Sequence, residues 1–286
     1  MLRTCSEAEF ERYLEFAYAL ATDLTRSGYP TYCDGVKTKA MFAARSRQAF
    51  RLDTEQLLLF ESEGTIEGVI HCEWIPEDRY LSTVCFSIRR GTEQALSEFL
   101  EYARTRFPGY DLFLGFPAEH RVAVRFLAER GFACIEDDYN NTAFLDECRS
   151  LPTHSGLIPI GIENYELFQA LHRPAEADMY WNSERILADL AHWNILVKEE
   201  RGIPQGAVYY RAVSDGWFEI FGVDVAGNRW EPQLFQELLN GALLDAKRRG
   251  GRFMTFFCER EYEDAAVECG FQCIGNYLCY KIHLES

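Results

Sequence analysis

Three kinds of side chain in this sequence could take part in chemistry: thiols, aromatic rings and carboxylates. Ten cysteines could bind a metal or form disulfides, but the sequence contains no Cys-x-x-Cys pair and no secretion signal. The closest run of cysteines is Cys269, Cys273 and Cys279, which lies around a Gly-Phe turn and a strand. We therefore expect reduced thiols in the core and no metal site.

Aromatic residues make up 14% of the chain, and some of them could line a pocket or stack on an amine. The candidates are Tyr180, Trp181, Trp193 and Trp217. The alternative is that each of them is an ordinary core residue, and the sequence leaves both interpretations open.

Carboxylates dominate the charge of the chain. Asp and Glu total 45 against 29 Lys and Arg, which gives a formal net charge of −16. This balance repels a phosphate backbone and excludes DNA and RNA as expected partners. It attracts cations, including amines, although the same charge also serves solubility alone.

The length and the apolar pattern indicate a protein of two ordinary domains. The chain has 286 residues and 48% hydrophobic content, which is enough for a core in each domain. Residues 1–10, MLRTCSEAEF, have no basic segment followed by an apolar stretch, and no window approaches the roughly 18 apolar residues of a membrane span. We expect a cytoplasmic protein without a membrane partner.

An internal repeat organises the chain. Residues 131–135, GFACI, reappear as residues 270–274, GFQCI, at an offset of 139. An amphipathic helical pattern repeats at the same offset, with four apolar residues in each copy. They are Leu96, Phe99, Leu100 and Ala103 in the first copy, and Phe235, Leu238, Leu239 and Ala242 in the second. The segment 146–159 combines Pro, Gly, Ser and Thr without periodicity, so we predict domains at 1–152 and 153–286.

Each half shows the same predicted order of elements, an antiparallel meander of three strands followed by helix, strand, helix and strand. In the first half these segments follow a helix over 7–25 and are 56–61, 66–74, 80–88, 92–106, 110–115, 120–130 and 132–145. In the second half they are 193–198, 206–211, 217–225, 232–247, 252–257, 262–268 and 271–283. No Gly-x-Gly-x-x-Gly or Gly-x-x-x-x-Gly-Lys motif occurs, so this order is not that of a dinucleotide-binding or P-loop domain.

This order resembles the GNAT family of acyl-CoA-dependent N-acetyltransferases. The segment HRVAVRFLAERGF carries the resemblance best, through Ala123, Phe126, Leu127, Gly131 and Phe132. Family members open this segment with Asn-x-x-Ala, and His120 stands at the Asn position. The second copy, EREYEDAAVECGF, keeps the Gly-Phe pair but has Tyr262 at the usual alanine. The resemblance implies an α/β fold of two tandem GNAT-like domains, each with a mixed sheet.

The resemblance also implies acetyl-CoA as cosubstrate, with its pyrophosphate held by free amides at a helix N-terminus. The family favours Arg or Gln, two residues, Gly, one residue, then Gly or Ala. The first copy reads Arg90-Gly91-Thr92-Glu93-Gln94-Ala95, with Glu93 at the central glycine, and the second copy, 228–233, has neither glycine. The expected cofactor-binding residues are Ser87, Ile88, Arg90, Gly91, Thr92, Glu93, Gln94, Ala95 and His120.

Both loops also have a purely structural explanation. A glutamate in the first turn stabilises a helix, and Pro232 fits the first position of one. We expect the first half to hold the cofactor, because Trp230 and Glu231 bring bulk and charge to the second loop and Pro232 removes a backbone donor.

Proton transfer is the second requirement that the resemblance implies, because an ammonium group must lose a proton before it attacks a thioester. Family members often use Glu on the fourth strand and Tyr on the last helix. Glu219 is the candidate base by position, although it could also be an ordinary strand residue. The usual tyrosine positions hold Leu127 and Ala266, which leaves Tyr262, one turn away, as the candidate acid.

Two functions of different class follow from these observations. The first is an N-acetyltransferase that acts on a primary amine of a small molecule or peptide. The second is a catalytically silent tandem module that binds an acyl-CoA or another ligand, or serves as a structural partner. The sequence leaves the acceptor and the oligomeric state open.

Overall fold

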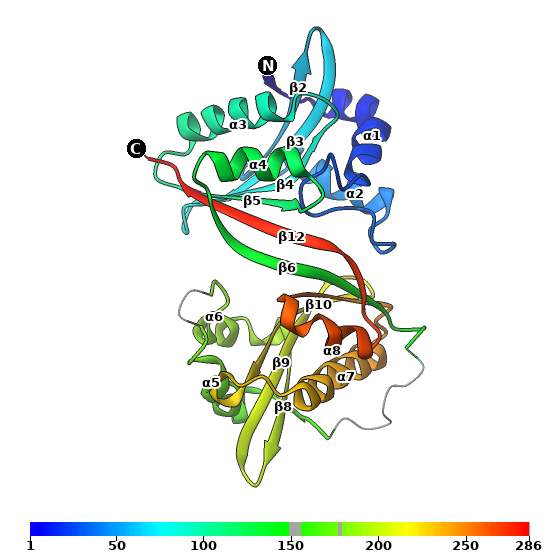
Figure 1. Ribbon diagram of the computed structural model, residues 1–286, viewed down its shortest axis with the longest axis vertical. Helices are drawn as coiled ribbons and strands as arrows, with labels where there is room; N and C mark the ends of the chain where they lie inside the picture. The colour runs from blue at the N-terminus through cyan, green and yellow to red at the C-terminus, as the bar shows by residue number, and fades with distance from the viewer. Residues whose placement is uncertain (149–155, 177–178, 286) are drawn as a thin grey trace. The chain divides into compact units, whose positions relative to one another are not determined.

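The computed structural model describes residues 1–148, 156–176 and 179–285, and it divides the chain into two compact units. Unit 1 comprises Met1–Asp138 and Gly275–Ser286, and unit 2 comprises Tyr139–Ile274. Both units are mixed α/β structures with one helix pair on each face of a sheet (Figure 1). The predicted fold class is therefore confirmed.

The elements of unit 1 follow the predicted order with one additional helix. They are β1 (Leu2–Thr4), α1 (Glu7–Ala21), α2 (Lys39–Arg47), β2 (Glu55–Ser62), β3 (Thr65–Ile75), β4 (Tyr80–Ile88), α3 (Thr92–Arg106), β5 (Asp111–Pro117), α4 (Arg121–Glu129) and the first part of β6 (Ala133–Phe144). The helix α2 was not predicted, because its nine residues carry only a weak apolar stripe.

Unit 2 repeats the order. Its elements are β7 (Ile158–Pro159), α5 (Tyr165–His172), α6 (Ser183–Ala188), β8 (Trp193–Glu200), β9 (Ile203–Ser214), β10 (Trp217–Val225), α7 (Pro232–Arg248), β11 (Phe253–Cys258), α8 (Glu263–Glu268) and the first residues of β12 (Gln272–His283). The short helices α5 and α6 were not predicted. Helices below about 12 residues depend on tertiary packing rather than on their own propensity.

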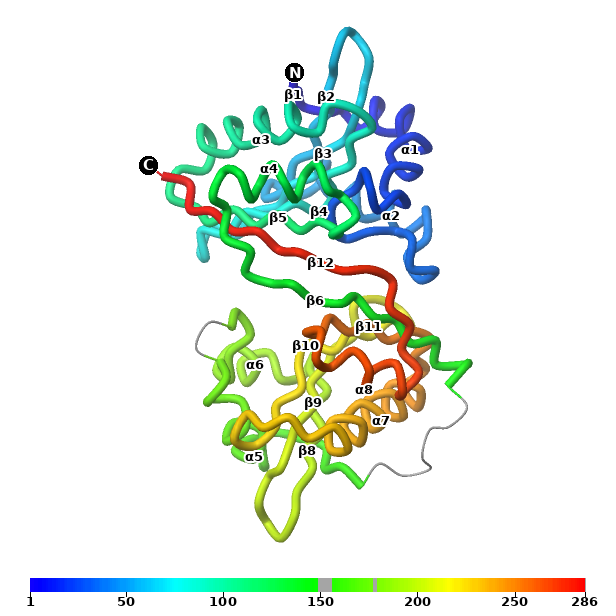
Figure 2. The backbone as a smooth tube through the Cα atoms, viewed as in Figure 1, coloured from blue at the N-terminus to red at the C-terminus, as the bar shows by residue number. Residues whose placement is uncertain are grey.

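The last strand of each sequence half begins in one unit and ends in the other. Residues Tyr139–Phe144 of β6 pair antiparallel with β11 in unit 2. Residues Tyr277–His283 of β12 pair antiparallel with β5 in unit 1, as the end of the chain in Figure 2 illustrates. The units therefore differ from the predicted division into 1–152 and 153–286, and the predicted boundary near Pro152 lies outside the described residues.

Each sheet contains a pair of parallel strands that separate part-way along their length. In unit 1, β4 and β5 pair only from Tyr80 to Ser82 on β4 and then diverge. In unit 2, β10 and β11 pair from Trp217 to Ile220 on β10 and then diverge. The apolar cores lie on both faces of each sheet. The divergence leaves backbone groups of two strands inside each sheet without a strand partner.

Candidate functional site

A pocket of about 380 Å³ lies at the start of α3 in unit 1. Gly91 precedes the helix with φ of 75°, a left-handed conformation that favours glycine, and no side chain caps the first turn. The first amides of α3 therefore have no partner within the helix, and with the helix dipole they make this end attractive to an anion. The pocket is lined by Thr25, Arg26, Ile88, Arg89, Arg90, Gly91, Thr92, Glu93, His120 and Val122.

Six of the nine residues predicted to bind the cofactor line this pocket. The other three do not. Ser87 is buried beside the Cys85 thiol, Ala95 belongs to the core, and Gln94 donates to Glu98 at 2.9 Å on the exposed side of the helix. The family resemblance indicated the loop, and burial of the flanking positions decides which side chains face the pocket.

The charged side chains of the pocket differ in their partners. Arg89 pairs with Glu67 at 2.7 Å and Arg26 with Asp23 at 3.3 Å. Glu93 turns to Arg125 at 2.8 Å, so its carboxylate is partly neutralised. Arg90 is exposed and has no ion pair or hydrogen bond within the described part of the chain. It is the basic side chain that an incoming anion could engage without breaking an existing pair.

His120 adds a neutral donor to the pocket. Its side chain is only 1% exposed, and its Nδ1 accepts the Ala123 N–H at 3.4 Å, which caps α4. Burial lowers the pKa of His120 to about 4, so the ring is neutral near pH 7. A neutral ring whose Nδ1 accepts carries its proton on Nε2. That Nε2 is buried and has no hydrogen-bond partner among the described residues.

A segment that sequence reasoning missed fills the divergence between β4 and β5. We call Arg26–Tyr29 the bridging segment. The Gly28 N–H donates to the Phe86 carbonyl at 2.7 Å, and the Tyr29 N–H donates to the Gly115 carbonyl at 2.9 Å. The Ile88 N–H donates back to the Arg26 carbonyl at 2.9 Å. The bridging segment thus forms hydrogen bonds with backbone groups of β4 and β5 that have no strand partner after the divergence.

Gly28 shows how closely the bridging segment fits. A Cβ atom at this position would lie 2.9 Å from the Gly115 carbonyl oxygen and 3.2 Å from the Phe86 Cβ. Its sequence context, Gly28-Tyr29-Pro30, indicates only the end of a helix. No local pattern reveals that the residues after that end enter a sheet.

The equivalent region of unit 2 has the opposite character. At the start of α7, Trp230 packs against Phe235 with ring centroids 5.1 Å apart and against Tyr262 at 4.9 Å. Pro232 occupies the first turn and offers no N–H. These features leave fewer backbone donors at α7 than at α3.

The two predicted catalytic residues lie on opposite faces of the unit 2 sheet. Tyr262 precedes α8 and joins the core against α7, and burial raises its pKa to about 12. Glu219 lies between Phe218 and Ile220, which both face that core, so its own side chain faces α5 and α6. The structure does not bring Glu219 and Tyr262 together.

Glu219 belongs to a polar row that crosses the strands in register. Arg211 on β9 and Thr255 on β11 are its direct neighbours, and Trp193 and Thr142 extend the row on either side. The row lies one position before the last pair, Ile220 with Phe256, after which β10 and β11 diverge. Side chains opposite one another in a sheet have Cβ atoms about 5 Å apart, so Glu219 and Arg211 are neighbouring residues of the row. The Arg211 guanidinium lies 3.6 Å from the Asp189 carboxylate.

Aromatic rings border this row. The Arg211 guanidinium lies 5.3 Å from the ring centroids of both Trp181 and Trp193, and the Trp193 centroid lies 5.1 Å from that of Phe221. Trp217 donates from its indole N–H to the Thr255 hydroxyl at 3.0 Å. Trp193 is a core residue, whereas Tyr180 is 46% exposed and packs on Trp181. Trp193 is therefore a core residue, and the interpretation of the other three as pocket residues stays a prediction.

A buried histidine holds the loop that carries Trp181. His172 Nδ1 lies 2.8 Å from the Asp224 carboxylate, and its Nε2 lies 2.9 Å from the Trp181 carbonyl. A carbonyl only accepts, so Nε2 carries a proton, and a further proton is shared between Nδ1 and Asp224. Burial alone would lower the pKa of His172, but its hydrogen bond to Asp224 and the charges of Asp224 and Glu176 raise it overall.

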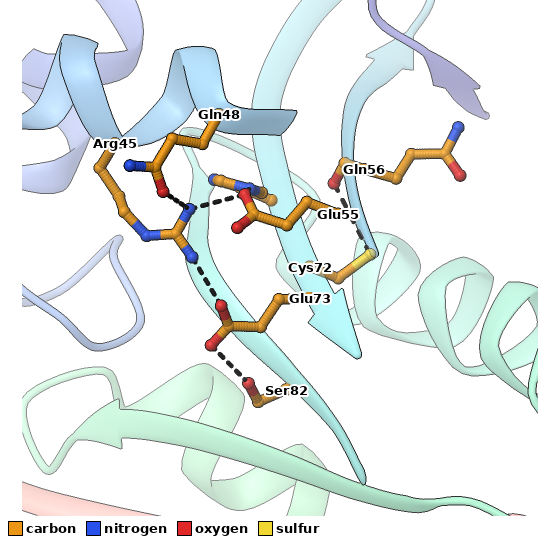
Figure 3. A network of polar contacts seen from close by, with 8 residues as sticks. Arg45, Gln48, Glu55, Gln56, Cys72, Glu73 and Ser82 are labelled. Atoms are coloured by element: carbon orange, nitrogen blue, oxygen red, sulfur yellow. Dashed lines mark hydrogen bonds and ion pairs between the residues drawn. The ribbon is translucent and has the colours of Figure 1, made fainter. Parts of the chain in front are cut away.

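Unit 1 carries a salt-bridge network at the positions that correspond to the polar row. Arg45 of α2 donates to Glu55 and Glu73, at 2.6 Å in each case, and Ser82 donates to Glu73 at 3.3 Å (Figure 3). Ser82 on β4 and Glu219 on β10 occupy corresponding positions. Each pairs with a charged residue of the preceding strand, Ser82 with Glu73 on β3 and Glu219 with Arg211 on β9. The two carboxylates at this place in unit 1, Glu55 and Glu73, are therefore engaged by Arg45.

None of the ten cysteines forms a disulfide. Within residues 1–148, 156–176 and 179–285, no group of three or more His, Cys, Asp or Glu side chains could hold a metal ion. Over the same residues, no helix has both the length and the apolar character needed to cross a membrane.

Comparisons of sequence find no match: no protein-family model and no curated protein corresponds to this chain. Comparisons of structure do. A GCN5-related N-acetyltransferase from Sphaerobacter thermophilus aligns over 100% of this chain and 96% of its own, with a TM-score of 0.66 and 15% identity. A tandem GNAT protein from the clavulanic acid biosynthesis pathway aligns over 100% and 99%, with a TM-score of 0.57 and 13% identity. The chain has the GNAT fold in two tandem copies.

A third GNAT structure aligns with both copies. It is the GCN5-related glucosamine N-acetyltransferase region of a fungal multi-domain GH3 β-N-acetylglucosaminidase, with a TM-score of 0.60 and 12% identity over 99% of this chain and 38% of that one. At such identities the similarity establishes the GNAT fold and not the activity. The resemblance to GNAT proteins drawn from the sequence is thus confirmed at the level of the fold.

Proposed function

We propose that this tandem GNAT protein transfers an acetyl group from acetyl-CoA to a primary amine of a small molecule or peptide. We further propose that the reaction centre lies on the α5 and α6 face of unit 2. The observation that carries the proposal is the position of Glu219, in a polar row at the point where β10 and β11 diverge. A carboxylate at this point would face an amine that reaches the opening between the strands.

Beyond the divergence, the side chains of β10 are more exposed than those of β4. Phe221, just past the divergence, is 36% exposed, whereas the β4 side chains from Val84 to Ile88 are at most 7% exposed. The backbone of β10 after Ile220 and the first turn of α7 would hold acetyl-CoA. Acetyl-CoA supplies the activated acetyl group, and its thiol, with a pKa near that of cysteine at about 8.5, can leave without a strong acid.

Glu219 would take the proton that the acceptor must lose. A primary ammonium with a pKa near 10.4 is unprotonated in only about one molecule in 2,500 at pH 7. Transfer of that proton to a positioned carboxylate contributes about 10²- to 10⁴-fold in rate. Arg211 lies opposite Glu219 in register, and its guanidinium lies 3.6 Å from the Asp189 carboxylate. Tyr262 has no part in this proposal, because it packs on the other face of the sheet.

The test is acetyl-CoA-dependent thiol release with a panel of primary amines. Glu219→Gln should lower kcat about 100-fold or more. Glu200→Gln, which changes an exposed carboxylate at the far end of β8, is the matched control and should leave turnover unchanged. Equal activity of Glu219→Gln and the wild type would exclude Glu219 as the base.

A second candidate function is a silent module that binds a ligand without turnover. The packing of Trp230 and Tyr262 at α7, together with Pro232, favours it, because these residues reduce the donors that a pyrophosphate would need. A ligand at 100 times its dissociation constant stabilises a fold by about 2.7 kcal/mol. A thermal shift with acetyl-CoA, without thiol release for any amine, would favour this second function.

A further inference from the structure

Four aromatic rings form one continuous surface on the α5 and α6 face of unit 2. Neighbouring ring centroids lie 5.1 Å apart for Tyr180 and Trp181, 5.2 Å apart for Trp181 and Trp193, and 5.1 Å apart for Trp193 and Phe221. We call these four residues the aromatic wall. Trp193 also belongs to the polar row that contains Glu219, so the wall and the proposed base share one side of the sheet.

We infer that the aromatic wall binds the ring of the acceptor, which is a primary amine whose short alkyl chain carries an aromatic group. The inference rests on the proposed function, because it takes Glu219 as the base. It adds the chemical class of the acceptor, and it assigns Phe221 as the residue that selects this class.

The aromatic wall is buried in the middle and exposed at both ends. Trp193 is only 6% exposed, and its centroid lies 6.1 Å from that of Tyr209 in the core. Tyr180 is 46% exposed, and the Arg185 guanidinium lies 4.0 Å from its centroid. Phe221, at the other end, is 36% exposed. Apolar surface that continues from a core toward polar side chains is typical of a binding site, so a ligand beside the polar row would contact Phe221.

A β-bulge in β10 gives Phe221 its position. The pairing of β10 with β9 shifts by one residue between Ile220 and Gly222, so Phe221 is the extra residue of the bulge. The Tyr209 side chain fills the space beside Gly222, where a Cβ atom would lie 2.1 Å from the Tyr209 hydroxyl oxygen. Because Gly222 leaves this space to Tyr209, the bulge can form and direct the Phe221 ring onto Trp193.

Glu219 and Phe221 are close enough for one small molecule to contact both. They lie on the same face of β10, and a strand rises about 3.3 Å per residue, so they are about 7 Å apart along the strand. An ammonium group at the Glu219 carboxylate would place a short alkyl chain beside Phe221. A ring at the end of that chain could then pack edge to face on the wall, as the rings of the wall pack on one another.

The charged groups beside the wall suit an acceptor with one ammonium group. Asp189 already pairs with Arg211 and with His192. The Arg211 guanidinium also lies 5.3 Å from the centroids of both Trp181 and Trp193. A second ammonium group of a polyamine would compete with this guanidinium for the carboxylate and for the indole rings. An aromatic group can contact Phe221 without that competition.

The first experiment measures kcat/KM by acetyl-CoA-dependent thiol release for 2-phenylethylamine, 2-cyclohexylethylamine and n-butylamine. The value for 2-phenylethylamine should exceed that for n-butylamine about 10-fold or more, because its ring buries apolar area and makes aromatic contacts. 2-Cyclohexylethylamine has a ring of similar size without a π face and should fall below 2-phenylethylamine. Equal values for 2-phenylethylamine and n-butylamine, or for the two ring-bearing amines, would overturn the inference.

The second experiment repeats these measurements with variants of the selecting residue. Phe221→Ala should reduce the preference for 2-phenylethylamine over n-butylamine about 10-fold, whereas Phe221→Tyr keeps the ring and should retain the preference. Ile203→Ala removes an exposed apolar side chain at the hairpin of β8 and β9. It is the matched control and should keep the preference of the wild type. An unchanged preference in Phe221→Ala would show that another surface binds the ring.

Calorimetric titration of the full chain with 2-phenylethylamine, with and without acetyl-CoA, separates this inference from the proposed function. Binding that depends on Phe221, without thiol release from any amine, would refute the proposed reaction and leave the aromatic wall as the site that binds the ring. Thiol release without a preference for the ring would support the proposed reaction and overturn this inference. Failure of 2-phenylethylamine to bind at millimolar concentration, with or without acetyl-CoA, would overturn this inference as well.

Discussion

At the residue scale, single side chains separate the two copies of the fold. Ser82 and Glu219 occupy corresponding positions on β4 and β10, yet Ser82 bonds to a glutamate already held by Arg45. Gly28 has no room for a side chain, and it allows the bridging segment to approach both β4 and β5. The chemistry of each unit therefore depends on which small or charged residue stands at the divergence of its strands.

Gly28→Ala should destabilise the protein by about 1–3 kcal/mol, because the new methyl group would meet the Gly115 carbonyl and the Phe86 side chain. Urea unfolding monitored by tryptophan fluorescence and circular dichroism would measure the change. Gly161→Ala is the control, since a Cβ there meets nothing within 4 Å and the backbone φ is −128°. A loss for Gly161→Ala as large as that for Gly28→Ala would argue against close packing of the bridging segment.

At the element scale, a buried ion pair connects α5 with the end of β10. His172 of α5 shares a proton with Asp224 of β10, and the same ring holds the Trp181 carbonyl. A second carboxylate, that of Glu176, lies 3.8 Å from His172. The Tyr209 ring packs against the imidazole. Trp181 in turn contacts Arg211, the neighbour of Glu219. The protonated pair of His172 and Asp224 thus holds Trp181, which lies beside the polar row.

The stability that this pair contributes should fall as pH rises. The pKa of His172 is raised above its ordinary value, and burial also raises the pKa of Asp224 against the opposing effect of His172. The folded state therefore binds protons more tightly than the unfolded state, so this contribution is complete below the ordinary histidine pKa of about 6.5 and is lost as pH rises through the folded value.

Urea unfolding of the wild type and of Asp224→Asn between pH 6 and pH 9 would test this. The difference in free energy of unfolding between the two proteins should shrink toward pH 9, because the variant lacks the charge that holds the proton. The comparison cancels contributions from other groups, such as Glu9, whose pKa is lowered to about 2. A difference that stays constant across this range would show that the pair does not titrate there.

At the scale of the whole molecule, the strand exchange makes each unit depend on a distant part of the sequence. Tyr277 on β12 packs edge to face on Tyr29 of unit 1, with ring centroids 4.7 Å apart. Tyr139 on β6 packs against the unit 2 core and faces Cys258 of β11. A change late in the sequence should therefore loosen the unit built mainly from early residues, and the converse should hold for Tyr139.

Tyr277→Ala and Tyr139→Ala form a reciprocal pair for hydrogen exchange. Tyr277→Ala should reduce amide protection in β5, and Tyr139→Ala should reduce it in β11, each by about 2 kcal/mol of local stability from the lost burial. The reverse pattern, with Tyr277→Ala acting on β11 and Tyr139→Ala on β5, would mean that each half keeps its own last strand.

The sequence by itself determined the repeated order of elements. Hydrophobic period and turn residues are local signals, and they located α3 at Thr92–Arg106, β4 at Tyr80–Ile88 and β10 at Trp217–Val225 at their observed bounds. The offset of 139 and the Gly-Phe pairs indicated two copies of one fold. The resemblance to the GNAT family indicated the loop before α3, whose Arg90 and Gly91 line the pocket.

Only the tertiary structure decided which strands are neighbours and which side chains meet. A strand pattern has the same period whichever strand it joins, so the exchange of β6 and β12 leaves no local trace. The bridging segment enters the sheet through backbone hydrogen bonds, which any residue can make, so only Gly28 marks it. Successive side chains of a strand point to opposite faces of the sheet, and the packing of α5 and α7 determines which face is which. Glu219 and Tyr262 therefore lie on opposite sides of the sheet.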